Sequence, residues 1–174
     1  MAEAATDILV LGAGPVGCAA ALALRESRHR VAVRETGAPP PGFRPIALSH
    51  ASRLILERLD AWRELAPTPI ETIRISQRGA FGRTRLEAAE CGVPALGYVV
   101  DYSALVRILR QRVAEHGLLR DAASAACTIH AEGSSPEARE KRYDQDAVVG
   151  LVELATPAQA TAFERFAEDG PIAL

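Results

Sequence analysis

The chain has 174 residues, of which 48% are hydrophobic and 24% are charged, a composition typical of a folded globular protein. Its formal net charge of −2 argues against a nucleic-acid binder driven by backbone charge, so no nucleic-acid partner is expected. No apolar stretch reaches the roughly 18 residues of a transmembrane helix, and residues 1–6 lack the basic-then-apolar pattern of a signal peptide. We therefore expect a cytoplasmic protein.

The N-terminal segment predicts a nucleotide-binding turn. An apolar run, residues 8–11, indicates a buried strand, and the small-residue run that begins at Pro15 indicates a helix packed closely on it. Gly12, Gly14 and Gly17 fit the pattern G-x-G-x-x-G. In this pattern Gly12 allows the tight turn, Gly14 lets a pyrophosphate approach the backbone, and Gly17 lets helix and strand touch.

The start of this helix is the expected phosphate site. Pro15 and Val16 open the helix, where unpaired N–H groups and the positive end of the dipole face an anion. The missing N–H of Pro15 costs little in the first turn.

An acid follows at the spacing that a ribose site requires. Residues 31–35 predict a second strand that ends at Glu35, about 20 positions after Gly14. A carboxylate there accepts hydrogen bonds from an unphosphorylated ribose, as in FAD or NAD, and disfavours the 2′-phosphate of NADP. The alternative is an ordinary strand–helix–strand turn with a solvent-facing Glu35.

The rest of the chain predicts short strands and two further helices. After a proline-rich loop at 37–42, a helix is expected over 49–62, with Ser49 as its N-cap. Its expected apolar face is Leu48, Ala51, Ile55, Leu59 and Trp62. A helix from Asp101, capped by Asp101 or Ser103, is expected to stop at His116 and Gly117. Strands are expected at 70–76, from 85, at 96–100, 127–130, 147–154 and 162–166, and from 171, with a polar loop at 134–142.

No catalytic side chain is assigned from the sequence. The four histidines are isolated, and His116 is interpreted as a helix-terminal residue. The three cysteines have no metal-site spacing, so we expect no metal and reduced thiols. Arg44, just before the second helix, is either a solvated loop charge or a phosphate or flavin contact.

With these residues in view, the sequence resembles the flavin-dependent aromatic hydroxylases of ubiquinone biosynthesis, the UbiH type. Four segments carry the resemblance: the glycine pattern with Glu35; residues 44–49; residues 75–82 followed by 95–100; and residues 143–149 with 162–166 and 170–174.

The resemblance implies an α/β fold in which a Rossmann-like FAD-binding domain is interleaved with part of a β-sheet substrate domain. It implies FAD along the glycine pattern, Arg44 near the flavin, and Glu132-Gly133 in place of a family Asp-Gly element. It also implies NAD(P)H as co-substrate, O₂, and a polyprenyl phenol whose ring is hydroxylated. The further partners it implies are the inner-membrane surface, where the chain would bind peripherally, and a ubiquinone-biosynthesis complex.

The expected boundaries are 1–66 and 95–133 for the FAD-binding domain, and 67–94 and 134–174 for the partial substrate domain. Residues 117–133 are fewer than the family has there, and Leu174 precedes the family's Gly-Asp-Ala motif. We therefore expect a truncated, internally shortened relative whose exposed apolar surface favours self-association. Two alternatives remain: a non-catalytic nucleotide-binding remnant, and an NAD-binding dehydrogenase domain.

Overall fold

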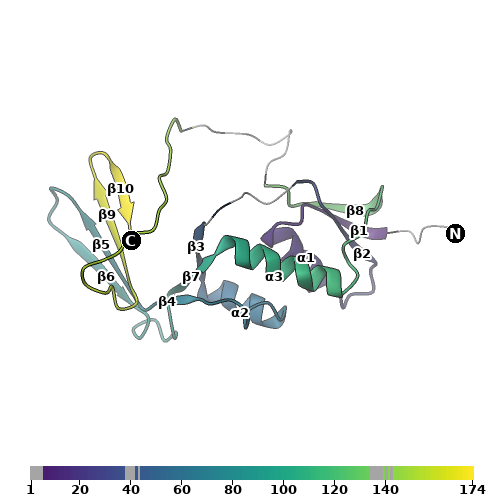
Figure 1. The fold of residues 1–174 in the computed structure, drawn as a ribbon, viewed down its shortest axis with the longest axis horizontal. Coiled ribbons are helices and arrows are strands. Elements are labelled where there is room, and N and C mark those ends of the chain that lie inside the picture. Colours follow the sequence, from purple (N-terminus) through teal and green to yellow (C-terminus); the bar gives the residue numbers. More distant parts are fainter. Residues whose placement is uncertain (1–5, 38–41, 43, 134–138, 140, 142) are drawn as a thin grey trace. The chain divides into compact units, whose positions relative to one another are not determined.

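The computed structural model describes residues 6–37, 42, 44–133, 139, 141 and 143–174 (Figure 1). The expected loops at 37–42 and 134–142 lie mostly outside the described residues. The chain divides into two compact units. Unit 1 comprises residues 1–44, 56–65 and 101–147, and unit 2 comprises residues 45–55, 66–100 and 148–174. Within the described ranges, no helix is both long and apolar enough to cross a membrane.

Unit 1 is built on a parallel three-stranded sheet in the order β2-β1-β8. The strands are β1 (Thr6–Leu11), β2 (Val31–Arg34) and β8 (Ala125–His130). Strand β1 is central because it pairs with both β2 and β8, and its apolar side chains are buried, as is usual for a parallel sheet. Leu9 and Leu11 pack with Ala32 and Ala122, while Val10, whose side chain alternates with theirs, is fully buried.

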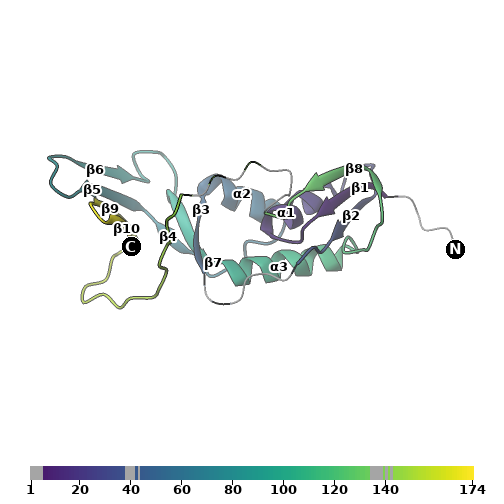
Figure 2. The ribbon, with the colours of Figure 1, turned by 90° about the horizontal axis from the view of Figure 1, so that it is seen from above.

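Two helices lie beside this sheet. Helix α1 (Pro15–Leu24) contacts β1, β2 and helix α3 (Tyr102–Glu115), and both views show α1 and α3 next to each other (Figures 1 and 2). The Asp101 carboxylate caps α3 by accepting a hydrogen bond from Ser103 N–H at 3.1 Å, and Gly117 ends it with φ +64°. The predicted limits of α3 are therefore confirmed.

Helix α2 (His50–Arg58) is shorter than predicted, and its buried face differs. Asp60 adopts φ +54°, which turns the chain after Arg58, so Leu59 and Trp62 are buried beyond the helix end. Ile55 is 54% exposed and Ala51 is also exposed, whereas Leu56 is buried, so the expected apolar stripe is wrong at Ala51 and Ile55. Strand β3 (Pro45–Ser49) was not predicted. Its last residue, Ser49, accepts the Ser52 N–H with its Oγ, as an N-cap of α2 does.

Unit 2 contains two sheets, ordered β3-β7-β4 and β10-β9-β5-β6. Strand β4 (Thr68–Ile70) pairs antiparallel with β7 (Gly97–Asp101). Strand β5 (Thr72–Gln77) pairs antiparallel with β6 (Arg83–Glu87) and parallel with β9 (Thr161–Ala167), which turns into β10 (Gly170–Ala173).

The single strand predicted over 70–76 is two strands. Ile70 C=O accepts the Leu96 N–H at 2.8 Å, but Glu71 N–H donates to Ala160 C=O at 2.8 Å. The chain therefore changes sheets at Glu71, because its backbone groups find different partners on either side of that residue.

The strand predicted over 147–154 is absent. Residues 147–154 form no strand, and Val148 and Leu151 are 100% and 80% exposed. Apolar composition is not sufficient for a strand, because the backbone also needs a neighbouring strand to pair with.

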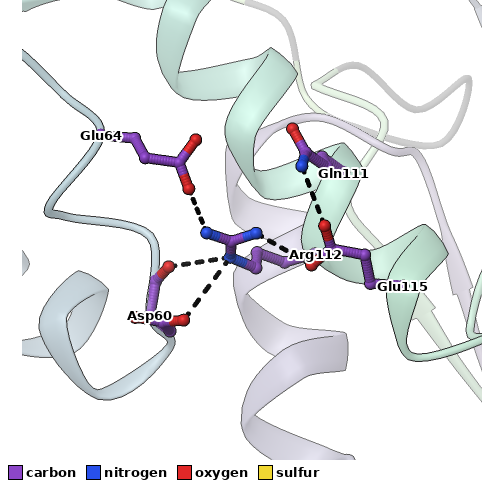
Figure 3. Close-up of polar contacts among 5 residues, drawn as sticks. All are labelled: Asp60, Glu64, Gln111, Arg112 and Glu115. Atoms are coloured by element: carbon purple, nitrogen blue, oxygen red, sulfur yellow. Dashed lines mark hydrogen bonds and ion pairs between the residues drawn. The ribbon is translucent and has the colours of Figure 1, made fainter.

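An arginine joins α3 to the turn after α2 within unit 1 (Figure 3). Arg112 Nε donates to Asp60 C=O at 2.9 Å, Nη1 donates to Glu115 at 2.8 Å, and Nη2 pairs with Glu64. The Gln111 side chain holds the same Glu115 carboxylate at 2.8 Å. These bonds raise the pKa of Arg112 above its ordinary value and lower that of Glu115.

We predict that Arg112→Ala lowers the melting temperature by a few degrees, since it removes a guanidinium shared by three acceptors. Thermal unfolding followed by circular dichroism would measure this, with Arg107→Ala, an exposed arginine on the same helix, as the matched control. The difference should shrink in about 1 M salt, which screens exposed charges. Equal melting temperatures for the two variants would contradict the role of Arg112.

A second ion pair joins the starts of β1 and β2. Both carboxylate oxygens of Asp7 accept from Arg30, whose Nη2 and Nε lie 2.9 and 3.1 Å away, and the Arg30 N–H donates at 2.8 Å. These hydrogen bonds hold the pKa of Asp7 well below its usual range. A carboxylate with a depressed folded-state pKa stabilises the fold above its unfolded pKa of about 3.9.

We predict that Asp7→Asn is less stable than the unmodified chain at pH 7, that the deficit begins to shrink as the pH falls below about 4, and that it disappears as the pH approaches the lower folded-state pKa of Asp7. Urea unfolding at a series of pH values would show this, with the exposed Asp146→Asn as control. A deficit that is independent of pH would mean that the Asp7 charge does not act through Arg30.

Candidate functional site

The carboxyl ends of β1, β2 and β8 bring most of the predicted site residues to one edge of the unit 1 sheet. Leu11 is the Cα partner of both Arg34 and His130 in the parallel ladders. Gly12, Glu35 and the 131–133 segment follow these residues directly. Parallel α/β sheets bind their ligands at this edge.

The three glycines have different surroundings. A Cβ on Gly17 would lie 2.0 Å from Gly12 O, and a Cβ on Gly12, whose φ is +99°, would lie 2.5 Å from Ala131 O. A Cβ on Gly14 would meet nothing within 4 Å. Gly12 and Gly17 are therefore required for backbone packing, whereas Gly14 faces open space in which a ligand could approach the main chain.

Helix α1 begins at this open position without a side-chain cap. Gly14 is the N-cap, Pro15 is in the first turn, and the turn carries no acidic residue. Val16 is 73% exposed. Because the helix start lacks an internal anion, its N–H groups and positive dipole end are available to an external one.

Glu35 is held by an arginine that the sequence did not single out. Arg110, on α3, places Nη2 3.0 Å from Glu35 Oε1. Its Nε donates to Ala13 C=O at 3.0 Å, in the middle of the glycine turn. In the sequence, Arg110 is marked only by its place next to Leu109, which is buried on α3. That place indicates a contact with Glu35 only once α3 is known to pack against α1.

The Cys18 thiol lies under the glycine turn and is unreactive. Its Sγ donates to Ala13 C=O at 3.4 Å, and burial raises its pKa to about 11. The thiol therefore stays protonated at neutral pH and is not a nucleophile.

Glu132 and Gly133 follow β8 next to the glycine turn. Ala131 N–H donates to Leu11 C=O at 2.8 Å, and Gly133 has φ +82°. The Glu132 carboxylate lies 3.1 Å from His130 Nδ1. Arg44 lies at the start of α3 instead, with its guanidinium 5.4 Å from the centre of the Tyr102 ring.

A hollow of about 310 Å³ lies beside Glu35 and was not foreseen from the sequence. It forms because residues 118–120 add to the outer side of β2: Val33 N–H donates to Leu118 C=O at 2.8 Å, and Arg120 N–H donates to Val33 C=O at 3.1 Å. Its lining residues are Val33, Arg34, Glu35, Leu119, Arg120 and Asp121.

Unit 2 has a larger concave surface over β5, β6, β9 and β10, and the hollow that it lines has a volume of about 970 Å³. Arg74, whose guanidinium lies 5.9 Å from the Phe163 ring centre, and the apolar Ile172 are part of its lining. The surface joins aromatic and apolar side chains to arginines, a combination that suits an aromatic molecule with a polar group.

Comparisons with known proteins support the resemblance seen in the sequence. No family model matches the chain. The chain is 39% identical over 75 residues to the ubiquinone hydroxylase UbiM of Neisseria meningitidis serogroup C / serotype 2a, covering 40% of this chain and 16% of that protein. It is 30% identical over 125 residues to 3-demethoxyubiquinol 3-hydroxylase of Escherichia coli K12, covering 67% of this chain and 32% of that protein. The chain therefore spans about a third or less of the length of these relatives.

The fold is similar to that of PqsL from Pseudomonas aeruginosa, described as a probable FAD-dependent monooxygenase. The TM-score is 0.52 at 18% identity, covering 72% of this chain and 32% of that one. The predicted α/β fold class is confirmed by this likeness, and the predicted resemblance to hydroxylases of ubiquinone biosynthesis is confirmed by the two sequence relatives.

We predict that Gly17→Ala loses at least about 3 kcal/mol of stability, because its Cβ would collide with the Gly12 carbonyl oxygen. Gly14→Ala, with open space at the same atom, should fold with a stability within about 1 kcal/mol of the unmodified chain. Urea denaturation of both variants provides the measurement. If Gly14→Ala unfolded as readily as Gly17→Ala, the glycine turn would not have the packing described.

Proposed function

We propose that this chain, a relative of ubiquinone and ubiquinol hydroxylases, binds FAD in unit 1 and is the cofactor-binding part of an aromatic hydroxylase. The observation that carries the proposal is the open space at Gly14, between two glycines that are packed against backbone, with Glu35 at the end of the neighbouring strand. The segments matched to this chain make up 16% and 32% of the length of these two relatives, so the complete hydroxylase is proposed to need more than this chain.

The residues present fit an FAD dinucleotide. The pyrophosphate would be held by the backbone at Gly14 and by the N–H groups of the first turn of α1, at Val16 and Gly17. The adenosine ribose would be held by the Glu35 carboxylate. The hollow beside Glu35, of about 310 Å³, is large enough for the adenine ring.

The other predicted site residues enter the proposal as neighbours of this dinucleotide. Glu132 and Gly133 would border the pyrophosphate, because they follow β8 beside the Gly12 turn. Arg44 would lie toward the flavin, at the start of α3. We propose no catalytic side chain, since FAD supplies the redox chemistry and the protein binds, orients and excludes water.

The reaction proposed for the complete hydroxylase is insertion of one oxygen atom of O₂ into an aromatic C–H bond. NAD(P)H supplies two electrons as a hydride and becomes NAD(P)⁺, and the second oxygen atom leaves as water, whose formation takes up one proton from solvent. The aromatic substrate proposed is a polyprenyl phenol, and its lipid tail would bring the enzyme to the inner-membrane surface as a peripheral protein, within a ubiquinone-biosynthesis complex. The concave surface of unit 2, with its aromatic and arginine side chains, is the proposed substrate side.

The two alternative functions differ from this proposal in their ligands. A dehydrogenase domain would bind NADH in preference to FAD. A non-catalytic remnant would bind neither tightly. The same Glu35 suits the ribose of either cofactor, so measured ligand preference separates the alternatives.

We predict that the purified chain retains FAD through gel filtration, seen as the flavin absorption bands, and does not retain FMN, which lacks the adenosine half. Glu35→Gln should weaken FAD binding about tenfold, because it replaces a charged hydrogen-bond acceptor with a neutral one. Flavin fluorescence titration measures both effects. Stronger retention of NADH than of FAD would favour the dehydrogenase alternative, and retention of neither would favour the remnant.

A further inference from the structure

Arg110 connects the two parts of the candidate nucleotide site. Its Nε is bonded to Ala13 C=O in the glycine turn, and its Nη2 is bonded to Glu35 Oε1, each at 3.0 Å. The guanidinium is planar and rigid, so two bonds from different nitrogens fix its orientation. The Arg110 side chain is 25% exposed, which leaves it partly shielded at the edge of the site.

This contact restrains a carboxylate that would otherwise be mobile. Glu35 is 48% exposed and follows the last residue of β2, so its side chain is not confined by a packed core. Binding a ribose hydroxyl would then require the side chain to be ordered, at a cost in conformational entropy. With Oε1 held by Arg110, much of this ordering is already present before a ligand arrives.

We propose that Arg110 is a positioning residue for ribose recognition: it holds Glu35 so that the carboxylate is directed at the 2′-hydroxyl of a bound adenosine nucleotide. This inference rests on the proposed function, because it assumes that Glu35 meets the ribose. It adds a residue from α3 to a site otherwise formed by the sheet edge and α1. Arg110 acts through Glu35, so its loss weakens the contact with the hydroxyl and leaves the contact with the phosphates.

A comparison of two small ligands tests this role. ADP has the 2′-hydroxyl and 2′-deoxy-ADP lacks it, while both have the same phosphates. In isothermal titration of the full chain, ADP should bind about tenfold more tightly than 2′-deoxy-ADP, as expected for one hydrogen bond to a charged group. Arg110→Ala should weaken ADP about tenfold, leave 2′-deoxy-ADP nearly unchanged, and so bring the ratio of the two affinities toward one.

Two further variants of α3 control for charge and for folding. Arg107→Ala removes the same charge from an exposed position one turn away and should leave both affinities unchanged. Arg110→Lys keeps the charge but cannot bridge both acceptors, so its affinity ratio should fall between those of the unmodified chain and Arg110→Ala. Melting temperatures would confirm that each variant is folded under the titration conditions.

A double-mutant cycle separates action through Glu35 from action through the glycine turn. If Arg110 acts through Glu35, Arg110→Ala should cause no additional loss of ADP affinity in a Glu35→Gln chain. An additive loss, or an equal loss for both ligands, would overturn the inference, because Arg110 would then act on the turn through Ala13. Weakening by Glu35→Gln with no effect of Arg110→Ala would also overturn it while leaving the proposed function intact. Failure of the unmodified chain to bind ADP would overturn both.

Discussion

The close approach of three backbone segments at the end of β1 is the constraint on which unit 1 depends. The carbonyl of Gly12 leaves no room for a side chain at Gly17, and the carbonyl of Ala131 leaves none at Gly12. The start of helix α1 is thereby held close to the carboxyl end of β1. Gly14, two residues from the tightest point, is left open, so the same geometry that excludes side chains also creates the space for a phosphate.

The elements predicted correctly are those whose signals are local in the sequence. Helix α3 has its capping Asp101, its apolar stripe and its terminal Gly117, and it begins and ends where these residues indicate. The division of the strand predicted over 70–76 was missed because it depends on partners distant in the chain. The division at Glu71 follows from hydrogen bonds to Leu96 on one side and Ala160 on the other, and no residue near Glu71 encodes it.

The candidate site shows the same contrast between features that are local in the sequence and features that depend on distant residues. The spacing of Glu35 from the glycines could be seen in the sequence because β1, α1 and β2 are consecutive. Arg110 lies about 75 positions further on, and only the packing of α3 beside α1 brings it to Glu35. The hollow beside Glu35 likewise depends on residues 118–120 joining the outer side of β2.

The pairing of β5 with β9 has a consequence for how unit 2 is assembled during synthesis. The two strands are neighbours in one sheet, but their paired residues are roughly 90 positions apart in the chain. At 5–20 residues per second, β9 leaves the ribosome about 5–20 s after β5. During that interval β5 and β6 form an isolated two-stranded hairpin, which is marginally stable, and β5 has an open edge. Unit 2 thus completes its four-stranded sheet only when the last strands of the described chain have been made.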